Sequence, residues 1–128
     1  MQIDRDHRNA RFAAHGRLVP TEAIELASDV LAAARAESLR TVVLNFKDMS
    51  LTRPLSVTEC HAAGGLLARA GAGLWKVALV ARSECVEAHA FLLTVALNRG
   101  LVTAAFRQES EALRWVREAP LAAAPWAA

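Results

Sequence analysis

Hydrophobic residues recur along this chain in two patterns, short continuous runs and a helical spacing of three or four residues. The near-continuous β-branched and apolar run at residues 41–46 predicts a strand that is covered on both faces of a sheet. Apolar runs at 74–80 and 101–106 predict two more strands, and the last leads directly into an acidic turn and a helix at 109–118. This order of strand and helix predicts an α/β domain with a largely parallel sheet.

The first nineteen residues predict two strands joined by a tight turn. Residues 1–3 suit a short edge strand, residues 6–9 suit a turn, and residues 10–19 suit a second strand with Gly16 as a bulge position. The connection is too short for a crossover, so these two strands are expected to be antiparallel. A helix then opens at Pro20, and its buried face is predicted from an apolar spacing of i, i+3, i+7 and i+10, occupied by Ile24, Ala27, Leu31 and Ala34.

Two further helices are predicted from their start signals. After an expected loop at 47–54, Ser56 and Glu59 have the S-x-x-E form of a capping box, which starts a helix that runs to about Ala70. Gly64 and Gly65 within it are expected to allow close packing of the helix on the sheet.

Ser83 is predicted to cap one continuous helix that ends at residues 98–100. Its inward positions are expected to be Val86, Ala90, Leu93, Ala96 and Leu97, so the chain should hold four helices in all.

Composition points to one soluble domain at residues 1–118, followed by a poorly ordered Pro/Ala-rich tail at 119–128 that contains Trp126. The 128 residues carry 15 Lys and Arg against 13 Asp and Glu, a balance too weak and dispersed for nucleic-acid binding. Two cysteines fit a reducing compartment, and neither a signal peptide nor a membrane-spanning run is expected. We therefore predict a cytoplasmic protein.

Three stretches carry a family resemblance: residues 42–46, 76–80 and 102–116, the last combining Phe, acidic residues, Glu-Ala, Trp and an aliphatic residue. Over residues 10–117 the chain resembles STAS domains, and most of all the stand-alone SpoIIAA-like proteins grouped with STAS/SEC14 domains. The resemblance implies a mostly parallel sheet of four or five strands with an antiparallel N-terminal edge strand. It also implies a non-enzymatic regulatory module without a cofactor, whose partner is a protein or a small, lipid-like ligand.

The chain departs from that family where anti-sigma factor antagonists carry a phosphorylatable serine in an Asp-Ser motif. Arg53 and Pro54 stand at the matching positions, and Asn45 stands where the family commonly has Asp. The resemblance therefore does not extend to a phosphorylation switch.

In a parallel sheet, the crevice beyond the carboxyl ends of the strands is the expected binding surface. This rim holds residues 47–56 and 82–84, whose candidate partner- or ligand-binding side chains are Ser50, Thr52, Arg53, Ser56, Arg82 and Ser83. Arg53 and Arg82 could hold an anion near helix N-termini, although solvated loop residues and helix caps explain the same pattern. Alanine-rich helices with an exposed apolar face can also support a homodimer.

Cysteine and histidine give an alternative function, a metal-binding protein or small enzyme. Cys60 and His61 are adjacent, and Cys85 and His89 are four residues apart on one predicted helical face. Both pairs open helices that should start on the same rim, so together they could hold zinc. Their spacing matches no standard zinc motif, and buried thiols with surface histidines are the simpler interpretation.

Overall fold

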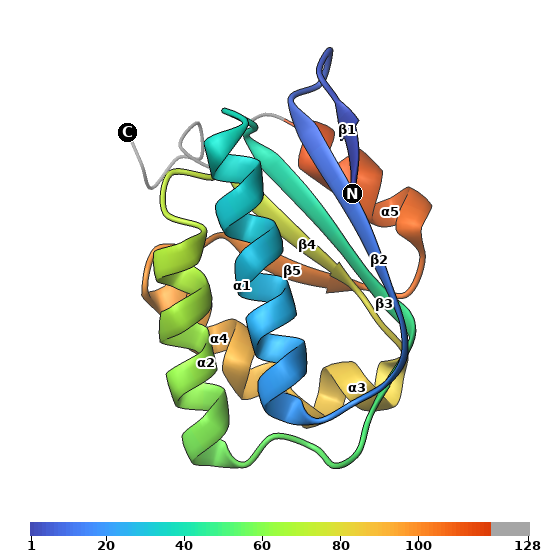
Figure 1. The fold of residues 1–128 in the computed structure, drawn as a ribbon, viewed down its shortest axis with the longest axis vertical. Helices are drawn as coiled ribbons and strands as arrows, with labels where there is room; N and C mark the ends of the chain where they lie inside the picture. Colours follow the sequence, from blue (N-terminus) through green and yellow to red (C-terminus); the bar gives the residue numbers. More distant parts are fainter. Residues whose placement is uncertain (119–128) are drawn as a thin grey trace.

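The computed structural model describes residues 1–118, which form a five-stranded sheet flanked by helices (Figure 1). The strands are β1 (Gln2–Asp4), β2 (Asn9–Leu18), β3 (Thr41–Leu51), β4 (Lys76–Val80) and β5 (Thr103–Phe106). The helices are α1 (Pro20–Ala36), α2 (Val57–Ala70), α3 (Ser83–Ala88), α4 (Ala90–Asn98) and α5 (Glu109–Arg117). The predicted tail with Trp126 lies outside the described residues.

The strands lie in the sheet in chain order, from β1 at one edge to β5 at the other. β1 pairs antiparallel with β2, and every later neighbour pairs in parallel. This confirms the α/β class, the N-terminal hairpin and the three parallel strands at the centre and far edge. Between parallel strands the chain must cross back over the sheet, and the intervening helices make those crossings.

The prediction of a loop at residues 47–54 is wrong in its first half. β3 continues to Leu51 and pairs with the second half of β2, where Gly16 lies opposite Met49. The irregularity predicted at Gly16 lies before it, because pairing passes from Ala13 opposite Asn45 to His15 opposite Asp48. β3 therefore contributes the additional residue. Exposed Lys47 and Asp48 gave this part of β3 a loop-like composition.

The helix expected from Ser83 to residue 98 is instead two helices, so the domain has five helices within residues 1–118. They meet at His89, whose backbone has left the helical region with φ −118°. Ser83 is the first residue of α3 rather than its cap, and Arg82 holds the cap position without a side-chain hydrogen bond. The break turns Ala90 and Leu97 outward, contrary to the predicted inward face, and leaves Leu97 half exposed.

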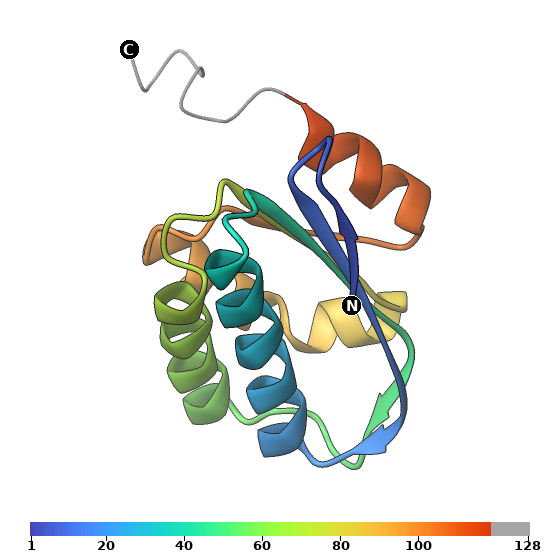
Figure 2. The same ribbon diagram turned by 45° about the horizontal axis from the view of Figure 1, so that its top comes forward.

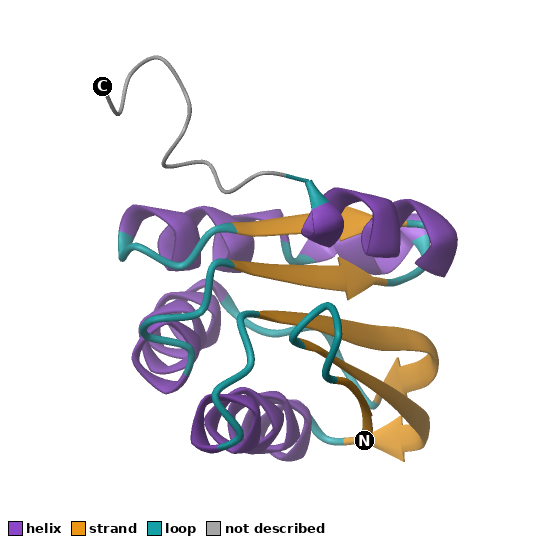
Figure 3. Cartoon of the chain, turned by 90° about the horizontal axis from the view of Figure 1, so that it is seen from above, coloured by secondary structure: helices purple, strands orange, loops and turns teal. Residues whose placement is uncertain are grey.

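The two faces of the sheet are covered differently. Side chains alternate along each strand, so Leu44 and Val77 face the α1 side, whereas Val43 and Ala78 face α5. Figure 2 shows α5 across the strands from α1 and α2. Seen from above in Figure 3, α1 and α2 stand side by side along nearly parallel axes.

The glycines of α2 permit close packing against another helix rather than against the sheet. A Cβ atom added to Gly64 would lie 2.7 Å from Cβ and Cγ1 of Val95 on α4.

The start of α2 is as predicted, since Ser56 accepts a hydrogen bond from the Glu59 amide and Glu59 accepts one from the Ser56 amide. Across residues 1–118, every helix falls short of the length and apolar character needed to span a bilayer.

Candidate functional site

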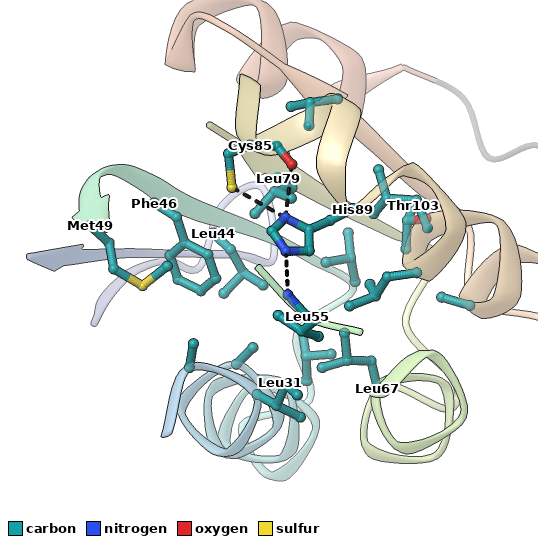
Figure 4. Close-up of a pocket in the computed structure, with 18 of the residues that line it drawn as sticks. Leu31, Leu44, Phe46, Met49, Leu55, Leu67, Leu79, Cys85, His89 and Thr103 are labelled. Atoms are coloured by element: carbon teal, nitrogen blue, oxygen red, sulfur yellow. Dashed lines mark hydrogen bonds between the residues drawn. The ribbon is translucent and has the colours of Figure 1, made fainter. Parts of the chain in front are cut away.

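An apolar cavity of about 100 Å³ lies between the sheet and the helices α1, α3 and α4. The strands supply its wall on one side through Leu44, Phe46, Val77 and Leu79, and α1 faces them. Figure 4 shows the cavity with Met49 and Thr103 at opposite ends. Of the twenty lining residues, all but Cys85, His89 and Thr103 have aliphatic, aromatic or thioether side chains.

Small side chains on α1 explain why this space is not filled. Ala23 and Ala27 line the cavity and are 7% and 4% exposed, so at these two positions the helix is close to the core but projects only a methyl group. Leu79 on the interior strand β4 consequently remains only half-buried, although both neighbouring residues of that strand are buried. Alanine satisfies the helical period without supplying the volume that closes a core.

His89, at the junction of α3 and α4, joins three parts of the cavity wall. The Leu55 amide donates a hydrogen bond to His89 Nε2 at 3.1 Å, and His89 Nδ1 lies 2.8 Å from the Cys85 carbonyl oxygen (Figure 4). An amide can only donate and a carbonyl can only accept, so Nε2 is the unprotonated nitrogen and Nδ1 carries the proton. His89 is thus held neutral, with both ring nitrogens occupied.

The two cysteines lack the features of a nucleophile. Burial raises the pKa of the Cys60 thiol and of the Cys85 thiol, which favours the protonated form over the reactive thiolate. Cys85 Sγ lies 3.5 Å from His89 Nδ1, but that nitrogen carries the proton bonded to the Cys85 carbonyl. The imidazole is therefore oriented as a structural link and does not act as a base toward the thiol.

The four candidate metal ligands do not converge. Cys85 and His89 meet, whereas His61 projects from α2 and stacks on Phe91 with ring centroids 6.4 Å apart. Within residues 1–118, no group of three or more His, Cys, Asp or Glu side chains is arranged to hold a metal ion.

The predicted rim residues mostly serve the local structure. Arg53 binds both carboxylate oxygens of Glu59, at 2.6 and 2.9 Å, and Arg82 donates to the Met49 carbonyl oxygen at 3.3 Å. Ser56 caps α2, and the Thr52 amide donates to the Leu18 carbonyl oxygen. Ser50 is exposed and Ser83 is half-buried. The two guanidinium groups are thus committed within the protein rather than aimed at a shared anion site.

Among the rim residues, the Glu59 carboxyl at the start of α2 has the pKa that is shifted furthest from its usual value. The hydrogen bond from Arg53, aided by that from the Ser56 amide, lowers the pKa of Glu59 to about 2. Glu59 thus remains ionised far below neutral pH, and its bonds to Arg53 and to the Ser56 amide flank Leu55, which lines the cavity.

The sequence patterns did not predict the cavity, because its volume depends on how side chains from distant segments pack against one another. The one available signal was the pair of alanines on the buried face of the first helix, opposite leucine and phenylalanine on a strand.

Comparison with known proteins found no family model that matches the chain, no matching curated protein and no matching solved structure.

Proposed function

We propose that this protein is a non-enzymatic binding module of SpoIIAA-like (STAS) type that holds a small apolar ligand in the cavity beneath its sheet. The observation that carries the proposal is the wall of that cavity, in which seventeen of the twenty lining residues are apolar hydrocarbon or thioether side chains. The antiparallel edge strand followed by a parallel sheet supports the family assignment.

The size of the cavity limits the ligand. An apolar cavity of roughly 150 Å³ in another protein stays free of water and binds benzene. About 100 Å³ is the same order, so the occupant is a single small ring or the end of an alkyl chain. A larger lipid-like ligand requires α1, α3 or α4 to move away from the sheet.

A regulatory role follows from the wall that Leu55 provides. Leu55 lines the cavity, and its amide is bonded to His89, so residues 53–56 connect the cavity to the surface. We therefore assign to this segment the contact with a partner protein, which would sense whether the cavity is filled.

The proposal is tested by titrating the protein with benzene while recording the thermal midpoint and the methyl NMR signals of the lining leucines. At ten times its dissociation constant, a bound ligand stabilises the fold by about 1.4 kcal/mol. Ala27→Leu fills the cavity and should weaken benzene binding at least tenfold. Ala33→Leu is the matched control, because Ala33 is exposed on the same helix.

Ala27→Val is the milder variant if leucine at this position prevents folding. Benzene that leaves the midpoint and the methyl signals of the wild-type protein unchanged would contradict the proposal. Equal binding to the folded Ala27 variant and the Ala33 control would show that the ligand binds elsewhere.

A further inference from the structure

We infer that the ligand is neutral and carries one hydrogen-bonding group, which pairs with the hydroxyl of Thr103 at one end of the cavity. The inference rests on the proposed function and specifies its ligand class. Phenols, small alcohols and ketones have this chemistry, whereas pure hydrocarbons and carboxylates do not.

The absence of ionised groups in the wall argues for a neutral ligand. None of the twenty lining residues, all within the described part of the chain, is Lys, Arg, Asp or Glu. His89 is held neutral by its two hydrogen bonds. A carboxylate or phosphate entering this space would lose its hydration without gaining a counter-charge, which is strongly unfavourable.

Thr103 is the polar lining residue that is left without a partner. Both nitrogens of His89 are occupied, and the Cys85 thiol is a weak donor beside that ring. In contrast, Thr103 Oγ1 is enclosed and has no hydrogen-bond partner among residues 1–118. Enclosed hydroxyls are almost always hydrogen-bonded, so an unpaired one on a residue that lines a cavity requires an explanation. A polar atom of the ligand supplies it.

The hydroxyl can reach the cavity without movement of the backbone. Thr103 is half-buried on β5 and lines the cavity, and rotation of its χ1 between staggered positions exchanges the hydroxyl with the methyl group. Figure 4 places Thr103 at the end opposite Met49, with Leu79 and Leu44 between them. A ligand bonded to Thr103 would therefore lay its apolar part along these leucines.

Benzene and phenol form a matched pair of probes, since they differ by one hydroxyl group and both are neutral at pH 7. The quantity to measure is the ratio of their dissociation constants, by NMR titration of the full chain. Thr103→Val removes the hydroxyl and retains the shape, so the preference for phenol relative to benzene should fall about fivefold, as expected for one hydrogen bond. Thr103→Ser retains a hydroxyl and should preserve most of that preference.

Ser28→Ala is the control, because Ser28 Oγ is likewise enclosed without a partner in the described residues but does not line the cavity. Its ratio should equal that of the wild type. Benzene binding with the same phenol preference in Thr103→Val and the wild type overturns this inference and leaves the proposed function intact. Failure of the wild type to bind either probe overturns both. Thr103→Ala replaces the valine variant if that protein does not fold.

Discussion

The two faces of the sheet show how differently the same strands can be covered. On the face toward α5, Val43, Ala78 and Val80 have no exposed surface, and Ala112 of the helix is equally enclosed. On the other face, Leu79 is only half-buried and borders the cavity. Adjacent residues of β4 thus lie in a closed core and in an incompletely filled one.

The difference comes from how the helices contact one another. α5 is a single amphipathic helix that packs on the sheet through Ala112 and Val116. On the other face, α2 packs closely on α4, where Gly64 lies against Val95. Helices that approach each other closely through a small residue such as Gly64 cover a narrower strip of the sheet, and Ala23 and Ala27 of α1 leave space above that sheet. A binding cavity can therefore arise from small residues in helices as well as from large gaps in the fold.

The largest expected effect is on the closed face, at Lys76. This lysine is 1% exposed, and its ammonium group donates to the Trp115 carbonyl oxygen at 2.8 Å and lies 4.8 Å from the centre of the Trp115 ring. Lys76→Ala removes the hydrogen bond, the contact with the ring and the packing of the buried stem, so it should lower the free energy of unfolding by about 3 kcal/mol. Urea denaturation measures the loss.

Lys47→Ala is the control, because Lys47 is the other lysine of the chain and its side chain is exposed on β3. Its effect should stay within about 0.5 kcal/mol. Equal, small effects of the two substitutions would show that the α5 face is not closed in the way described.

Two valines of β4 test the comparison on a single strand. Val80 is fully enclosed on the α5 face, whereas Val77 lines the cavity. Val80→Ala creates a new void and should cost about 2.5 kcal/mol. Val77→Ala enlarges a space that the valine side chain already borders, so the cost should be about 1.5 kcal/mol.

Benzene sharpens this test, because a ligand in the cavity can replace the contacts that Val77→Ala removes. Benzene stabilises every variant that keeps the cavity, so the quantity to compare is the gain relative to the wild type. Saturating benzene should stabilise Val77→Ala more than it stabilises the wild type, and Val80→Ala by the same amount as the wild type. An equal gain beyond the wild-type value in both variants would mean that the two faces are equally accessible to an apolar ligand.

The strands of the fold were predictable because their signals are local. Residues 41–46 form a near-continuous β-branched and apolar run, and the capping box of Ser56 and Glu59 marks the start of a helix within four residues. The extension of β3 to Leu51 was missed because Lys47 and Asp48 are polar, and only the second half of β2 gives that segment a partner. Pairing between distant segments overrides local composition.

The site was less predictable than the fold. The break at His89 depends on tertiary structure, since the ring bonds to the Leu55 amide 34 residues earlier in the chain. The rim arginines could be placed correctly at the strand ends, but their commitment to Glu59 and to the Met49 carbonyl could not be foreseen from spacing. The cavity is lined by residues from many separate segments, so no single sequence pattern predicts it.

The smallest expected effect concerns the Arg53–Glu59 ion pair beside the cavity face, and it depends on pH. The pKa of Glu59 is lowered from 4.5 to about 2 in the folded protein, so its stabilising contribution is present above pH 4.5 and is lost as the pH falls toward 2. Glu59→Gln should therefore lower the thermal midpoint slightly at pH 7, and the difference from the wild type should shrink between pH 4.5 and pH 2. Glu25→Gln, at an exposed position of α1, is the control and should shift the midpoint less at pH 7.

Benzene binding by Glu59→Gln at pH 7 separates two ways of holding the wall that Leu55 provides. If the hydrogen bond from the Leu55 amide to His89 is sufficient, the dissociation constant of benzene should stay within about twofold of the wild-type value, because the ion pair is exposed and exposed pairs contribute little. A much weaker affinity for benzene in this variant, with the affinity of the Glu25→Gln control unchanged, would mean that the cavity wall depends on a surface ion pair. The shape of the α5 face would then be fixed by packing alone. The affinity of the cavity for its ligand would instead respond to pH and salt concentration.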